Sequence, residues 1–169
     1  MGVDELIKKT GIPLVSRCRC CGEHEEESID HLFVKGELAA NVWRYISEVF
    51  YMPFPENTSI FNLASLWFTN SKGRSLFHYL MKMVPMLILW EVWLERNRRN
   101  HENIFLSPSE VTRKVIRWLK ELAPFCVVKR ICNFQENLSL SQMGINDVEV
   151  TSPSVIFTRW LKPQRDKFK

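Results

Sequence analysis

Residues 83–90, MVPMLILW, are the longest apolar run in the chain. The run lies within residues 74–103, whose composition predicts one long α-helix. A helix that is apolar on all sides is normally surrounded by other elements, so we expect this one at the centre of the fold. Pro85 removes a backbone donor inside the helix and clashes with the preceding turn, and it therefore predicts a kink or a break.

The segments around this helix also have helical periodicity. Residues 37–51 place Val42 and Trp43 on one apolar face, and residues 59–69 form a second apolar segment. Residues 107–110, SPSE, combine a hydroxyl cap, a proline at the first helical position and an acid at the third, and they predict the start of another helix. With a short helix at residues 4–9, the sequence predicts a mainly α, irregular domain of about five helices. Five tryptophans fall on apolar faces and are expected in the core: Trp43, Trp67, Trp90, Trp93 and Trp118.

The C-terminal part has a different composition. Residues 133–153 are polar and predict a linker, whereas residues 154–161 are rich in β-formers and predict one isolated strand. A lone strand cannot form a sheet by itself. We therefore divide the chain into a Cys/His region (1–51), a helical connector (52–132), a polar linker (133–153) and a strand with a basic tail (154–169).

Composition limits the class of protein. At 169 residues the chain suits one domain with tails. It has five cysteines, three of them within four residues, and this pattern favours a reducing compartment and a metal site over disulfides. The N-terminus has no secretory signal, and the longest apolar run is too short to span a bilayer. We expect an intracellular protein, nuclear or cytoplasmic, that is not secreted and has no membrane partner.

Cys18 and Cys21 stand in the C-x2-C spacing that lets two thiolates bind one metal ion from a tight turn. His31 offers a third ligand ten residues later. Structural zinc sites normally take four Cys or His ligands. His24 or Cys20 could supply the fourth, and Cys20 could instead replace one of the pair. Zinc is the candidate cofactor, and the alternative is a set of reduced, metal-free cysteines.

Positive charge is concentrated in the second half of the chain. Residues 1–60 carry six Lys or Arg against ten Asp or Glu, whereas residues 95–132 carry nine against four. Such a footprint is typical of contact with RNA or DNA through phosphates, although solvated helix faces look the same. The acidic run 23–27 beside the cysteines is expected to be a solvated loop and argues against phosphate contact there. The candidate nucleic-acid-binding residues are Arg96, Arg98, Arg99, Arg113, Lys114, Arg117 and Lys120.

Three stretches resemble, in order, parts of plant LINE-type (non-LTR) retrotransposon polyproteins. Residues 3–43, which include the Cys/His set, resemble the zinc-binding region that follows the reverse transcriptase. Residues 85–97, with Ile88, Trp90 and Trp93, resemble the connector that comes next. Residues 158–169 resemble the first strand of the ribonuclease H domain.

The resemblance implies a module without a catalytic centre. The family usually places a cysteine five residues after the histidine, where this chain has Gly36, so the resemblance implies only Cys18, Cys21 and His31 as ligands. The reverse transcriptase and ribonuclease H acids are both absent, so we expect no enzyme activity. The implied role is weak, sequence-independent nucleic-acid binding that assists a reverse transcriptase. Two alternatives remain: a protein-interaction module acting by dimerisation or by strand addition through residues 154–169, and a retroelement remnant without function.

Overall fold

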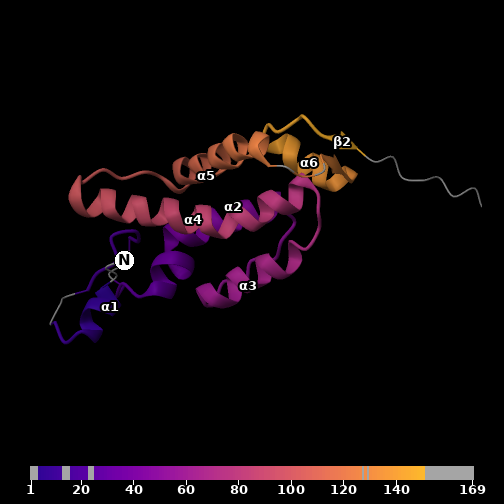
Figure 1. Cartoon of the computed structure of the whole chain (residues 1–169). Helices are drawn as coiled ribbons and strands as arrows, with labels where there is room; N and C mark the ends of the chain where they lie inside the picture. The colour runs from indigo at the N-terminus through magenta and orange to yellow at the C-terminus, as the bar shows by residue number, and fades with distance from the viewer. Residues whose placement is uncertain (1–3, 13–15, 23–24, 127, 129, 151–169) are drawn as a thin grey trace, which may run out of the picture.

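The computed structural model describes residues 4–12, 16–22, 25–126, 128 and 130–150 (Figure 1). This part of the chain is mainly α, as the sequence predicts. Its helices are α1 (Asp4–Lys9), the π-helix η1 (His31–Lys35), α2 (Glu37–Val49), α3 (Ile60–Asn70), α4 (Leu76–His101), α5 (Pro108–Leu122), the 3₁₀ turn η2 (Ala123–Phe125) and α6 (Phe134–Gln142). Strands β1 (Ile131–Cys132) and β2 (Glu149–Val150) form a short parallel pair.

The long helix α4 is central to the described fold. It contacts α2, α3 and α5, and α5 lies beside it in the opposite direction (Figure 1). The expected break at Pro85 is absent, because α4 continues through this buried proline as one helix of 26 residues. Buried Val84 and Ile88 lie on either side of Pro85 and pack in the core, which holds the helix together where one backbone donor is missing.

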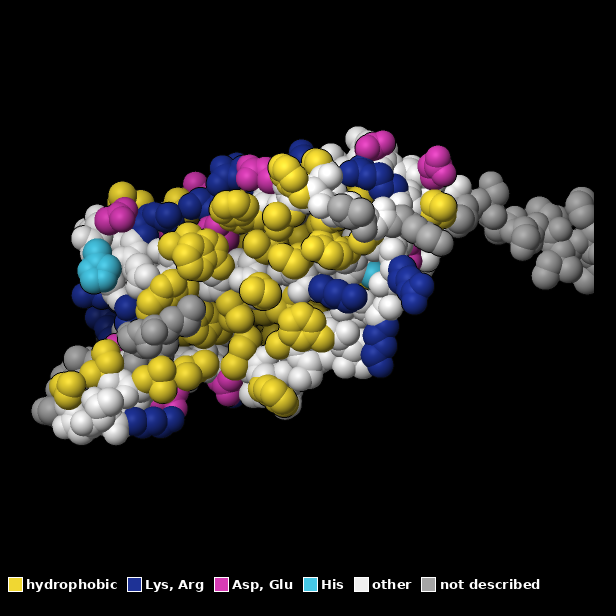
Figure 2. Space-filling model, viewed as in Figure 1, with side chains coloured by type: hydrophobic (Ala, Val, Ile, Leu, Met, Phe, Trp, Pro, Cys, Tyr) yellow, Lys and Arg dark blue, Asp and Glu magenta, His cyan; other side chains and the backbone are white. Residues whose placement is uncertain are grey.

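One face of α4 differs from the prediction, because no described element covers it. Met86 is 61% exposed, Trp90 is 49% exposed and Tyr79 is 40% exposed. Figure 2 shows apolar side chains gathered across the middle of the molecule, where α4 lies in Figure 1. The expectation that Trp90 belongs to the core is therefore wrong.

The other four tryptophans among the described residues are buried or partly buried. Trp43 and Trp67 are fully buried with ring centroids 5.9 Å apart, and Trp43 Nε1 donates to the Phe33 carbonyl at 2.8 Å. Trp93 packs partly buried against the core. Trp118 Nε1 donates to Glu91 Oε1 at 2.7 Å, so it also connects α5 to α4.

Residues 133–150 are not the polar linker that the sequence predicts. Asn133 and Glu136 form a capping box that begins α6, and Leu140 on this helix is fully buried. β1 precedes α6 and β2 follows it, and the two strands pair in parallel with Ile131 opposite Glu149. The predicted strand at residues 154–161 lies outside the described residues. None of the helices in the described ranges has both the length and the apolar character that crossing a bilayer requires.

Candidate metal centre and basic surfaces

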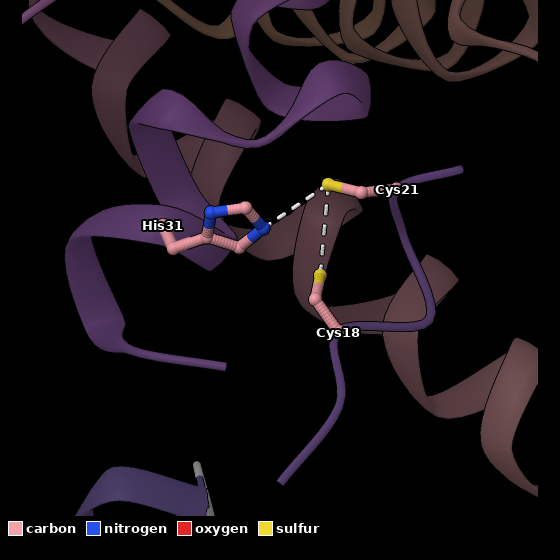
Figure 3. Close-up of side chains that lie close together, drawn as sticks. All are labelled: Cys18, Cys21 and His31. Atoms are coloured by element: carbon pink, nitrogen blue, oxygen red, sulfur yellow. Dashed lines mark hydrogen bonds between the residues drawn. The ribbon is translucent and has the colours of Figure 1, made fainter. Parts of the chain in front are cut away.

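Cys18, Cys21 and His31 lie together near the N-terminus, with their ligand atoms all within 4.8 Å of one another (Figure 3). The two cysteines come from one loop, and His31 is the first residue of η1. Ser28 positions this residue, because its Oγ accepts from the His31 backbone N–H at 3.1 Å. The ring of His31 points its Nε2 at Cys21 Sγ, 3.1 Å away.

The distance between the Cys18 and Cys21 sulfurs fits a bound zinc ion, and the Cys21–His31 distance nearly fits one. Two sulfurs bound tetrahedrally to one zinc, each at about 2.3 Å, lie about 3.8 Å apart, and a sulfur–nitrogen pair lies about 3.6 Å apart. The Cys18 and Cys21 sulfurs are 3.8 Å apart. The Cys21–His31 pair would have to separate by about half an ångström, which a side-chain rotation can provide. Three donors of the residue types that zinc prefers are therefore in place.

A second layer of contacts orients these ligands. Glu25 Oε2 lies 2.8 Å from His31 Nδ1, which leaves Nε2 facing the cysteines. A carboxylate behind a ligating histidine fixes its tautomer and raises its basicity. At the start of α2, the Glu37 backbone N–H donates to Cys21 Sγ at 3.2 Å. The sequence reasoning missed both contacts, because it treated Glu25 as part of a solvated loop.

The thiols of the metal-free site hold their protons. Hydrogen bonding with Cys20, together with burial, raises the pKa of Cys18 from 9.0 to about 11. The adjacent thiol of Cys18 and burial raise the pKa of Cys21. Because zinc binds thiolates, a metal entering this site would have to displace both protons.

Gly36 lies tightly against the ligand atoms. A Cβ added at Gly36 would lie 2.9 Å from Cys21 Sγ, 3.2 Å from His31 Nε2 and only 2.7 Å from the His31 carbonyl oxygen. A side chain at this position would therefore project into the cluster and force it to shift. Cys20 is buried but does not join the group among the described residues, and His24 lies outside them.

The acidic run beside the cysteines is a loop with exposed Glu25 and Glu26, as predicted, but Glu27 is buried and all three described members are paired. Glu26 pairs with Lys8, and Glu25 with His31. Glu27 is 1% exposed, and its two carboxylate oxygens accept from Arg96 Nη2 at 2.8 Å and Nε at 3.2 Å. Since Arg96 lies on α4, this pair fixes the Cys/His region to the central helix.

The neighbouring arginines of α4 also have structural partners. The buried Glu95 carboxylate pairs with Arg98 at 2.6 Å and with Arg99 at 2.8 Å, and it also accepts from the Leu106 backbone N–H. Arg99 in turn donates to the backbone carbonyl of Arg19 in the Cys loop at 3.0 Å. Three of the seven predicted nucleic-acid-binding residues, Arg96, Arg98 and Arg99, therefore neutralise buried acids.

The four predicted nucleic-acid-binding residues on α5 are more accessible. Arg113, Arg117 and Lys120 are exposed and are spaced along one side of the helix. Arg117 Nε lies 3.7 Å from Glu121, an exposed pair of a kind that contributes little to stability. Lys114 is half-buried, with its Nζ 3.9 Å from Glu91. The exposed trio forms what we call the α5 basic face.

Comparison with known proteins finds a family match for the N-terminal part of the chain. Residues 1–43 match the family described as zinc-binding in reverse transcriptase. The match supports a reverse-transcriptase zinc-binding domain and includes all three residues of the candidate metal centre. All of α4 and all of α5 lie beyond this zinc-binding region, since the match ends within α2. No curated protein and no solved structure matches the chain.

Proposed function

We propose that this chain is the zinc-binding and connector part of a LINE-type retroelement polyprotein and has no catalytic centre of its own. In this proposal Cys18, Cys21 and His31 hold Zn²⁺ as a structural ion, which joins the Cys loop to η1 when it is bound. The observation that carries the metal role is the three-donor cluster with Glu25 behind the histidine. The match of residues 1–43 to a zinc-binding family supports the same conclusion.

The proposed role of the domain is to bind RNA or DNA weakly and without sequence preference, so that template is held near a polymerase. The α5 basic face supports this role, since its three cations are exposed on one side of a helix. Lys and Arg side chains in such an arrangement contact phosphates and do not read bases. Each phosphate contact on a single strand makes the plot of log affinity against log salt concentration steeper by about 0.7.

The test of this role is charge reversal at Arg113, Arg117 and Lys120. We expect the triple glutamate variant to lose nearly all affinity for a labelled oligonucleotide at low salt. The salt slope should become shallower by about two. The matched control reverses three exposed cations elsewhere, Lys72, Arg74 and Lys82, and so changes the net charge equally. Equal losses in the two variants would refute the assignment to α5.

A second candidate function is protein interaction through the exposed face of α4. Tyr79, Met86 and Trp90 recur at helical spacing on this face, and exposed apolar areas of this kind mark interaction sites. If the face forms a dimer, Met86→Glu should convert the protein to a monomer in analytical ultracentrifugation. The control is Phe61→Glu on α3, where the side chain is 76% exposed and the oligomeric state should not change. A wild-type protein that is monomeric at high concentration would exclude self-association.

A further inference from the structure

A hollow of about 530 Å³ lies between the Cys loop and the end of α4. We call it the Cys-loop pocket, and its lining includes Arg17, Arg19, Arg96, Asn100 and Phe105, together with Cys18 and Cys21. Its walls come from segments about 80 residues apart in the sequence. The pocket adjoins the metal centre, because Cys18 and Cys21 belong to both.

The charge of this pocket is positive where it is accessible. Its two acids, Asp4 and Glu27, share the single guanidinium of Arg96, at 3.4 Å and 2.8 Å. Three arginines against two acids leave the lining with a net charge of +1. Arg17 and Arg19 are exposed, and no described side chain forms an ion pair or a hydrogen bond with either guanidinium. Two cations at the mouth of a polar hollow suit an anion with several oxygens, such as a phosphate.

An aromatic ring lies at the other side of the pocket. Phe105 is 57% exposed, and the Arg99 guanidinium lies 5.4 Å from its ring centroid. Arg99 also donates to the carbonyls of Arg19 and Leu106, at 3.0 Å and 2.8 Å. Arg99 thus fixes both the Phe105 ring and the loop that carries Arg17 and Arg19. Exposed aromatic rings beside cations are the surfaces on which unpaired bases stack.

We propose that the Cys-loop pocket binds one nucleotide of a single-stranded nucleic acid, with its phosphate on Arg17 and Arg19 and its base against Phe105. This inference rests on the proposed nucleic-acid role but assigns a second contact, separate from the α5 basic face. Arg17 and Arg19 flank Cys18 in the sequence, so their positions depend on the loop that the metal would order. Binding in this pocket should therefore depend on the order of this loop, whereas binding to α5 should not.

The experiment measures anisotropy of a labelled single strand and of a duplex of the same length, about 20 nucleotides. Arg17→Ala with Arg19→Ala should weaken single-strand binding about tenfold and lower the salt slope by about one. Phe105→Ala should weaken single-strand binding about fivefold or more and leave the duplex unchanged, because duplex bases cannot stack on the ring. The matched control, Arg113→Ala with Arg117→Ala, should weaken single strand and duplex equally. All these positions are exposed, and unchanged urea midpoints would verify that the variants fold.

The outcomes separate this inference from the proposed function. Wild-type affinity in the Arg17/Arg19 variant, with loss in the α5 variant, overturns the pocket and leaves the proposed function standing. The reverse result supports the pocket and refutes the assignment to α5. A wild-type protein that binds neither probe at low salt refutes both.

Discussion

Replacing Arg96 by Met should destabilise the protein strongly, although the sequence alone makes this residue look like a surface ligand. Methionine keeps most of the length of the side chain and removes the charge. The change leaves the Glu27 carboxylate, 1% exposed, without its bidentate partner. It also releases Asp4, which lies 3.4 Å from the guanidinium.

The magnitude follows from burial on both sides of the pair. The Arg96 and Glu27 side chains are 11% and 2% exposed, so the pair belongs to the buried class, in which removing one partner costs about 3–5 kcal/mol. Glu27 keeps weak acceptance from the Asp4 backbone N–H at 3.4 Å, which places the expected loss near the lower end, about 3 kcal/mol. The exposed pair of Arg117 and Glu121 supplies the contrast, since Arg117→Met should cost about 0–1 kcal/mol.

The assay is urea unfolding followed by tryptophan fluorescence, with the free energy of unfolding compared among the wild type and both arginine variants. A double-mutant cycle with Glu27→Gln should give a coupling energy of at least about 1 kcal/mol between Arg96 and Glu27. A loss below about 1 kcal/mol in Arg96→Met, or a coupling energy near zero, would falsify the structural role.

Four further predictions concern the metal centre and the core. Glu25→Gln should weaken zinc binding about 10- to 100-fold in competition with a chelating dye, because the carboxylate orients His31; an unchanged affinity would argue against this contact. Between pH 6 and 8 the apparent zinc affinity should rise by up to about 100-fold per pH unit, since two protons leave as the metal binds, and a pH-independent affinity would exclude the thiols as ligands. In the metal-free protein the raised pKa of Cys18 makes stability fall with rising pH, whereas zinc affinity rises. The stabilisation by the protonated thiol is complete below pH 9.0 and is lost as the pH rises through about 11, which thermal unfolding would reveal. Trp118→Phe should cost about 1–3 kcal/mol in urea unfolding, because it removes a hydrogen bond to the buried Glu91 carboxylate; a neutral result would mean that water replaces the indole.

Elements with a local signal could be predicted from the sequence. The ligands Cys18, Cys21 and His31 lie close together in the chain, so their spacing alone suggested that they meet. The helix that begins at Pro108 carries its capping box in four consecutive residues, and the structure confirms it. The capping box of α6, at Asn133 and Glu136, is equally local. It was missed because the surrounding residues are polar and hide the short buried side of that helix.

Long-range pairs had no such signal. Arg96 and Glu27 are 69 residues apart, and nothing in periodicity or composition connects them. A run of arginines after an apolar helix looks the same whether its charges face solvent or buried acids. The apolar character of α4 was likewise ambiguous, because a sequence pattern cannot tell whether an apolar face is covered by the same chain, as at Ile88, or is left exposed, as at Trp90.

The metal content of the purified protein tests the central claim most directly. Protein prepared without chelator should contain close to one equivalent of zinc by elemental analysis, since a structural site is nearly fully occupied. Cys18→Ser with Cys21→Ser should lose this zinc, whereas Cys126→Ser with Cys132→Ser, which removes two buried cysteines outside the cluster, should keep it. Less than about a tenth of an equivalent in the wild type, or equal loss in both double variants, would contradict a zinc site at Cys18, Cys21 and His31.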